Sequence, residues 1–245
     1  MSPLRRESRA PAVCRMVERY YVALDETAEY LRAIGAPGEV RVTGIPVDPV
    51  FAEAKDRGEV RRRHGLDAHR TTLLVSAGGY AVGPVEQLVS GLLAFDRPWQ
   101  IVAVAGKAEA TRRRLEALAS RSRGHARLHV VGFTKEMDEW MAAADLLVGK
   151  AGGLTVSEAL ARGLPMALME PIPGQEERNA DHLLERGAAI RCNNLPVAAW
   201  KIAQLLENPA RLEQMRTAAR AMGRPHAARE IAADALSLLG KKGRI

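Results

Sequence analysis

The sequence has few aromatic residues, two cysteines and no long apolar run. Aromatic side chains make up 4% of the 245 residues, which argues against a protein that stacks single-stranded nucleic acid on aromatic faces. Cys14 and Cys192 lie far apart, so neither a disulfide framework nor a zinc site is expected, and a reducing cytosol is favoured. No stretch approaches the roughly 18 consecutive apolar residues of a membrane-spanning helix, and residues 1–15 lack the apolar core of a signal peptide.

Positive charge is in excess. The chain contains 36 Lys and Arg against 29 Asp and Glu, a formal net charge of +7. Such an excess favours an anionic partner, which can be nucleic acid, a lipid surface or a phosphorylated ligand. A hydrophobic content of 47% is enough for the core of one large or two small domains.

From Thr71 onward, short apolar segments alternate with helical ones. The six apolar segments read TTLLVSAGG, WQIVAVAG, RLHVVGF, DLLVGKAGG, LPMALMEP and AAIRC. Strands that are apolar along their whole length and separated by helices predict a parallel sheet covered on both faces. The expected fold is therefore a doubly wound, Rossmann-like α/β domain, with helices from Pro196 to Leu239 wrapping around it.

The part before this domain is too short to fold alone. It reads as the last part of a domain, with the Pro-stiffened stretch Gly44–Pro49 as a crossing between domains, and the basic run Arg61–Arg63 as a solvated helix face. The expected division is 1–46 as the remnant of an N-terminal domain, 47–69 as linker and charged helix, 70–192 as the Rossmann-like domain, and 193–245 as C-terminal wrapping helices and basic tail.

Ligands of doubly wound sheets bind at the carboxyl ends of the strands, so the loops after the strands are the candidate sites. After the first strand, Gly78 and Gly79 begin a glycine-rich turn into a helix, which either binds a phosphate or is structural. After the third strand, Phe133 either faces a planar base or lies in the core. After the fifth strand, Gln175 and Glu176 either bind sugar hydroxyls or begin a helix.

The loop after the fourth strand is the most informative. Lys150 and the pair Gly152-Gly153 turn the chain into a helix that begins near Leu154, whose first N–H groups have no partner within the helix. Thr155 adds a hydroxyl. Glu158 follows about one turn later and either accepts hydrogen bonds from both hydroxyls of a ribose or stabilises the helix N-terminus electrostatically.

Taken together and in order, the segment GKAGGLTVSEALARGLPMALMEPIPGQEERNADHLLERGAA resembles the donor-binding signature of glycosyltransferase family 28. It is most similar to the branch of monogalactosyldiacylglycerol synthases and processive diacylglycerol glucosyltransferases. The resemblance runs from about Arg19 to Leu236 and includes VTGIPVDPVF and VVGFTKEMDEWMAAADLLVGKAGG. It implies the two-domain GT-B fold, whose C-terminal half binds a UDP-sugar without a catalytic metal, and no cofactor.

The resemblance also implies a role for each loop. Phe133 would meet the uracil, Glu158 the ribose hydroxyls, and Gln175 with Glu176 the hexose hydroxyls. The remaining residues would surround the diphosphate: Gly152, Gly153, Leu154 and Thr155 at the helix start, and Gly78 and Gly79 at the edge of the cleft. Lys150 either assists as a nearby cation or has a structural pairing.

The function that this resemblance implies is an inverting, metal-independent transfer of glucose or galactose from a UDP-hexose to a lipid such as diacylglycerol. The family has a longer N-terminal acceptor domain, so the catalytic base is expected outside this chain and is not assigned. The alternative is a donor-binding subunit or inactive fragment that needs a separate acceptor-domain protein. An NAD-dependent Rossmann enzyme is disfavoured, because the ribose-binding acid is on the late helix rather than about 20 residues after the first glycine loop.

The remaining positive charge fits a cytoplasmic enzyme at the inner face of an anionic membrane better than a nucleic-acid binder. The residues on which this expectation depends are Arg5, Arg6, Arg9, Arg61–Arg63, Arg112–Arg114 and the tail 241–244.

Overall fold

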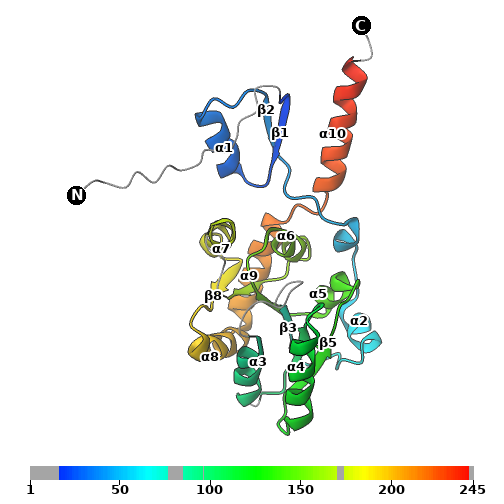
Figure 1. Ribbon diagram of the computed structural model, residues 1–245, viewed down its shortest axis with the longest axis vertical. Helices are drawn as coiled ribbons and strands as arrows, with labels where there is room; N and C mark the ends of the chain where they lie inside the picture. The colour runs from blue at the N-terminus through cyan, green and yellow to red at the C-terminus, as the bar shows by residue number, and fades with distance from the viewer. Residues whose placement is uncertain (1–16, 77–84, 96, 170–173, 243–245) are drawn as a thin grey trace, which may run out of the picture. The chain divides into compact units, whose positions relative to one another are not determined.

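The computed structural model describes residues 17–76, 85–95, 97–169 and 174–242, which fall into two compact units (Figure 1). Unit 1 comprises residues 1–46 together with 227–245, and unit 2 comprises Val47–His226. Each unit has its own hydrophobic cluster.

Unit 1 is a small βαβ arrangement with one further helix. Its strands β1 (Arg19–Val22) and β2 (Glu39–Val42) pair in parallel, and the helix α1 (Asp25–Ala33) connects them. Helix α10 (Ala227–Lys242) comes from the other end of the chain. Apolar residues of α1, of both strands and of the loop before β2 form the core of this unit, namely Val22, Ala28 and Leu31 with Tyr20, Ala36, Val40 and Val42 around them.

Asp234 connects α10 to the two strands of unit 1. Its carboxylate accepts hydrogen bonds from the Tyr21 hydroxyl at 2.7 Å and from Arg41 at 2.6 Å, and it also pairs with Arg19. The structure differs here from the expectation that all helices up to Leu239 wrap the Rossmann-like domain. The partners of α10 are polar groups of β1 and β2, which periodicity within the helix does not reveal.

Unit 2 contains six strands that alternate with helices. In chain order its elements are η1 (Pro49–Ala52), α2 (Arg57–Arg63), β3 (Thr72–Ser76), α3 (Val85–Ala94), β4 (Gln100–Val104), α4 (Glu109–Arg121), β5 (Arg127–Val131), α5 (Met137–Ala143), β6 (Leu146–Gly149), α6 (Gly153–Ala161), β7 (Met166–Leu168), α7 (Gln175–Glu185), β8 (Ala189–Arg191), α8 (Leu195–Leu206) and α9 (Pro209–Met222). No helix within the described ranges is long and apolar enough to cross a bilayer.

The six strands form one parallel sheet in the order β5-β4-β3-β6-β7-β8. The strand order reverses between β3 and β6, as in a dinucleotide-binding Rossmann sheet. Successive residues of a strand face opposite sides, and both sides are buried: Leu73 and Val75 belong to one hydrophobic cluster and Leu74 to the other. The predicted doubly wound α/β domain is thereby confirmed.

Helices cover both faces of this sheet (Figure 1). The first cluster takes its helical residues from α3, α4, α8 and α9, and the second from α2, α5, α6 and α7, with one alanine of α9. Residues 47–69, expected as linker and charged helix, contribute Phe51, Val60 and Leu66 to the second cluster, where each is at most 6% exposed. This segment is therefore part of the core of unit 2.

Asp145, which precedes β6, is surrounded by three guanidinium groups. Its carboxylate accepts hydrogen bonds from Arg57 at 2.8 Å, Arg61 at 2.7 Å and Arg216 at 2.8 Å, and from the Thr72 N–H at 2.9 Å. Arg61 is only 5% exposed, so its predicted place on a solvated face is wrong. A buried charge needs a partner, and Asp145 supplies it from a distant part of the chain.

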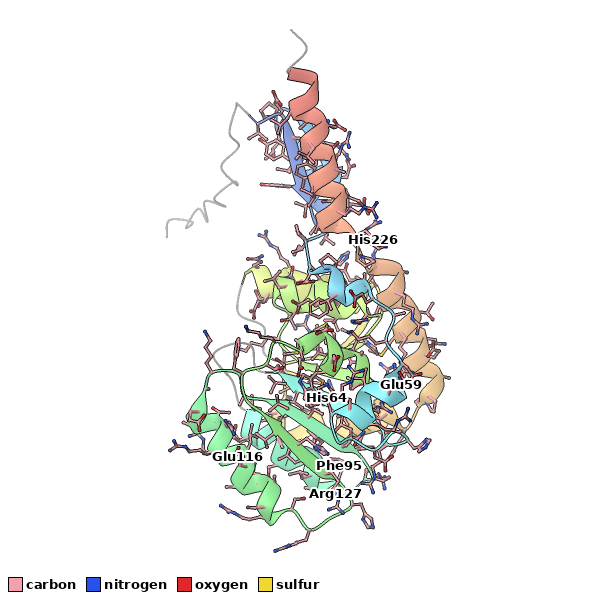
Figure 2. All side chains as sticks on the ribbon, turned by 90° about the vertical axis from the view of Figure 1, so that its right-hand side faces the viewer. Glu59, His64, Phe95, Glu116, Arg127 and His226 are labelled. Atoms are coloured by element: carbon pink, nitrogen blue, oxygen red, sulfur yellow. The ribbon has the colours of Figure 1, made fainter. Side chains whose placement is uncertain are left out.

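Most other residues of the expected basic surface that the structure describes also have acidic partners. Arg63 pairs with Glu139 at 2.5 Å, and His64 beside it contacts the same carboxylate at 2.6 Å; Figure 2 shows His64 next to α5. The basic run on α4 is paired as well. Arg112 pairs with Glu116, Arg113 with Glu109 and Arg114 with Glu86. Glu116 is labelled in Figure 2. Arg5, Arg6, Arg9 and the side chains of the tail 241–244 lie outside the described residues.

Replacing Asp145 with Asn should lower the free energy of unfolding by at least about 2 kcal/mol, because three guanidinium groups lose their shared anion. Urea unfolding followed by circular dichroism measures this change. The matched control is Asp181→Asn, which removes an exposed Arg191 pair and should cost less than about 1 kcal/mol. Equal effects of the two substitutions would contradict the structural importance of Asp145.

Candidate functional site at the carboxyl ends of β3 and β6

The reversal of strand order places the turn after β6 beside the carboxyl end of β3. These two strand ends pair closely, since Gly149 lies opposite Ser76 in the register. A Cβ atom at Gly149 would lie 2.6 Å from the backbone oxygen of Ser76, a distance too short for any other residue. Glycine at this position therefore permits the close pairing at the point where such sheets bind ligands.

The turn itself is held from a second helix. Ala151 is completely buried, and its carbonyl oxygen accepts a hydrogen bond at 2.9 Å from the side-chain amide of Asn179 on α7. Gly152 then adopts the extended conformation of an N-cap. Asn179 thus positions the turn, a role that the sequence analysis did not assign.

The start of α6 presents backbone donors that have no acceptor within the helix. The first helical hydrogen bond runs from Val156 N–H to the Gly152 carbonyl at 2.9 Å, so the N–H groups of Gly153, Leu154 and Thr155 precede it and have no acceptor within the helix. Gly152 has no side chain with which to cap them. Leu154 is 60% exposed. This end of α6 has the geometry of an anion site, and the helix dipole adds a partial positive charge.

Glu158 lies on α6 one turn after Leu154 and Thr155, so the three residues share a face of the helix. Its side chain is half-buried, and burial raises the pKa of its carboxyl to about 7. Among the described residues no hydrogen bond or ion pair to this carboxylate is found. An isolated carboxylate in this environment is an acceptor for ligand hydroxyls.

The loop before α7 reaches the same place. Gly174 has φ +105° and ψ −108°, a conformation that only glycine adopts readily, and its N–H donates to Glu177 at 3.1 Å. Gln175 and Glu176 then begin α7. A Cβ atom at Gly152 would lie 3.8 Å from Glu176 Oε1. The structure thus brings Glu176, predicted after the fifth strand, close to the glycine turn predicted after the fourth.

Phe133 follows β5 and is 62% exposed, so the alternative that placed it in the core is wrong. Lys107, in the loop after β4, holds its Nζ 5.4 Å from the centroid of the Phe133 ring. Lys107 is not among the predicted site residues, although the rule that ligands bind after parallel strands applies equally to the loop after β4. An exposed ring beside a cation is a suitable surface for a planar base.

Two further predictions concern the phosphate region. Gly78 and Gly79 lie outside the described residues. Lys150 stands one residue after β6 and is half-buried, with no ion pair to another described residue. Lys150, Glu158, Glu176 and Phe133 therefore all follow the carboxyl ends of strands of one sheet.

Comparison with known proteins assigns part of this chain to a protein family. The family described as glycosyl transferases group 1 matches residues 84–222. The processive diacylglycerol beta-glucosyltransferase of Staphylococcus saprophyticus is 33% identical over 224 residues, which cover 91% of this chain and 56% of that protein. The Bacillus subtilis protein of the same name is 36% identical over 202 residues, covering 82% and 52%. The chain spans about half the length of these relatives, and they lie in the branch that the sequence resembles.

Solved structures share the fold. Acinetobacter baumannii MurG has a TM-score of 0.60 and 22% identity, with 87% of this chain and 64% of that chain covered. The UDP-GlcNAc 2-epimerase of Neisseria meningitidis, solved with UDP-GlcNAc, has a TM-score of 0.68 and 14% identity, with 90% and 61% covered. At these identities the likeness concerns the fold, which is the expected GT-B type.

The pKa of Glu158 predicts a pH-dependent stability. Because the folded-state pKa lies above the usual value of 4.5, the native protein binds more protons than the unfolded chain between about pH 4.5 and 7, and its stability falls as pH rises through this interval. Glu158→Gln should remove this loss. Its free energy of unfolding should therefore rise relative to that of the wild type, by about 1 kcal/mol or more between pH 5 and 7.5.

Urea unfolding at several pH values measures this difference. Glu185→Gln is the control, because Glu185 is an exposed residue on α7. A difference between Glu158→Gln and wild type that does not change with pH would contradict the burial of an ionisable Glu158.

Proposed function

Because the chain belongs to the glycosyl transferases group 1 family, we propose that unit 2 binds a UDP-hexose for transfer of its sugar to a lipid. The relatives are named as diacylglycerol glucosyltransferases, and we extend a lipid acceptor such as diacylglycerol, with glucose or galactose as the sugar, to this chain. The observation that carries the proposal is the Glu158 carboxylate, which has no partner among the described residues. It lies at the same end of α6 as the N–H groups of Gly153, Leu154 and Thr155, which have no acceptor within the helix.

The N–H groups at the start of α6 and the Glu158 carboxylate suit two different parts of a nucleoside diphosphate, the diphosphate and the ribose. These N–H groups and the helix dipole suit the charge of the diphosphate, and Lys150 adds a cation next to them. The Glu158 carboxylate suits the ribose, whose two hydroxyls both donate hydrogen bonds. Phe133 and Lys107 would contact the uracil. Gln175 and Glu176 would bind the hexose hydroxyls, and Gly78 and Gly79 would form the edge of the phosphate site.

The reaction that fits this site is a single displacement with inversion at the anomeric carbon. A base deprotonates the lipid hydroxyl as UDP leaves, and the negative charge that develops on the β-phosphate is stabilised by the α6 N-terminus. Backbone amides, the helix dipole and Lys150 would supply this field without a metal. No residue of this chain is assigned as the base. We place the enzyme in the cytoplasm, at the inner face of an anionic membrane.

The donor assignment is tested with UDP and 2′-deoxy-UDP. Wild-type protein should bind UDP at least about fivefold more tightly than 2′-deoxy-UDP, which lacks one of the ribose hydroxyls. A hydrogen bond to a charged acceptor is worth about 1 kcal/mol or more. Glu158→Ala should bind the two nucleotides equally. Isothermal titration calorimetry measures these constants, with Glu185→Ala as control and EDTA present to test metal independence. Equal affinity of the wild type for both nucleotides would refute the role of Glu158.

The transfer itself is tested with UDP-glucose or UDP-galactose and vesicles that contain diacylglycerol. Formation of a β-linked glycolipid from the α-linked donor would support an inverting transferase. Donor binding without transfer would favour the alternative, a donor-binding subunit completed by a separate acceptor-domain protein.

A further inference from the structure

A cavity in unit 2 lies away from the loops that we propose to bind the UDP-hexose. It measures about 580 Å³ and is lined by the segment 51–57, the ends of α5 and α6, and Arg220 of α9. Ala144 and Leu164, which line it, stand just before β6 and β7. The cavity is therefore at the amino ends of these strands, whereas the donor loops follow their carboxyl ends. The nine residues of α6 separate the two places by about 13 Å.

The charged side chains around this cavity are mostly basic. Among its described lining residues, the charged ones are Lys55, Arg57, Arg162 and Arg220 and the one carboxylate of Glu53. This is a formal excess of three positive charges at one cavity. Such an excess at a concave site favours an anion.

Arg162 is fixed at the back of the cavity. Its guanidinium, 8% exposed, donates to the backbone oxygens of Val50, at 2.7 Å, and of Glu53. Its Nε is buried and has no hydrogen-bond partner among the described residues. A buried donor without an acceptor is costly in a folded protein; because this atom is buried, a ligand in the cavity reaches it only if neighbouring atoms move.

The neighbouring carboxylates are shared among several cations, and Glu139 also lies 4.0 Å from Lys55. Asp138 is shared by Lys55 at 3.0 Å and Arg162 at 3.8 Å, and Asp145 is shared by Arg57 and two further arginines. Burial lowers the pKa of Arg57. The negative charge of Asp145 raises it, and the positive charges of Arg216, Arg61 and Arg220 lower it further. The neighbouring arginines therefore repel Arg57, and an anion in the cavity, between Arg57 and Arg220, would offset this repulsion.

Arg220 reaches the opening of the cavity because of Gly163. A Cβ atom at Gly163, which has φ +62°, would lie 2.4 Å from Arg220 Cγ, so the aliphatic part of Arg220 lies directly over the glycine. Its side chain remains 62% exposed, with a long contact to Glu213 at 3.6 Å. Arg220 can therefore move its guanidinium onto a ligand without breaking a buried pair.

We propose that this cavity binds a phosphate group, free or esterified, between Arg57, Arg162 and Arg220. Guanidinium groups bind phosphate oxygens in bidentate fashion, and the volume leaves room for a substituent such as glycerol. The ligand would connect the segment after Pro46 to the end of α9, so its binding stabilises unit 2. The site is independent of the UDP-hexose site and of the function proposed for it.

The test uses the full chain in a buffer without phosphate. Titration with inorganic phosphate and with glycerol 3-phosphate, in the presence of saturating UDP, is followed by calorimetry and by the melting temperature, which rises when a ligand binds the native state. We expect saturable binding by the wild type, and at least tenfold weaker binding by Arg57→Gln and by Arg220→Gln. Arg113→Gln is the matched control, because it removes one charge from an exposed position on α4, and it should bind within twofold of the wild type.

Arg220→Gln decides the outcome if Arg57→Gln fails to fold, because Arg220 is exposed. Absence of phosphate binding by the wild type, or equal affinity in all variants, would overturn the proposal. Retention of UDP binding by Arg220→Gln separates this site from the donor site, and the same titration without UDP remains informative if UDP does not bind.

The source of the phosphate is distinguished by vesicles. If the natural ligand is a lipid headgroup, vesicles with phosphatidylglycerol should bind the wild type more tightly than Arg220→Gln, and vesicles of phosphatidylcholine alone should bind neither. If vesicle binding is equal for the two proteins while glycerol 3-phosphate binds the wild type, a soluble phosphate ester is the ligand.

Discussion

The pairing of β3 with β6 is the constraint on which the rest of unit 2 depends. The strand order reverses between these two strands, so the helices that follow them diverge and leave a ligand site at their carboxyl ends. At that end, Gly149 allows the backbone to approach Ser76 O. At the other end, Asp145 accepts the Thr72 N–H and connects this strand pair to α2 and α9 through arginines.

The two ends of this strand pair use positive charge differently. At the carboxyl end, backbone N–H groups and a helix dipole provide the field for an anion, and few charged side chains are needed. At the amino end, guanidinium groups outnumber the carboxylates that they share. The net charge of +7 is therefore a poor guide to partners by itself, because most described arginines of the basic runs are paired with Asp or Glu.

Much of the fold follows from sequence patterns, and the exceptions have a common cause. All six predicted strands of the sheet are present, since a fully buried parallel strand has to be apolar along its length. The segment 47–69 was assigned as a linker because its charges obscure Phe51, Val60 and Leu66, which pack into the core. Helix α10 was assigned to the wrong neighbours because its contacts depend on Asp234 and strands at the other end of the chain.

By itself, the sequence determined the elements, their order and the glycine turns after the strands, because periodicity and backbone freedom are properties of adjacent residues. The environment of each functional side chain was decided only by the tertiary structure. Arg57 meets Asp145 across 88 positions, Lys107 meets Phe133 from a different loop, and the pKa of Glu158 depends on what surrounds it. Charge pairing and desolvation act through space, between residues whose proximity the folded chain alone creates.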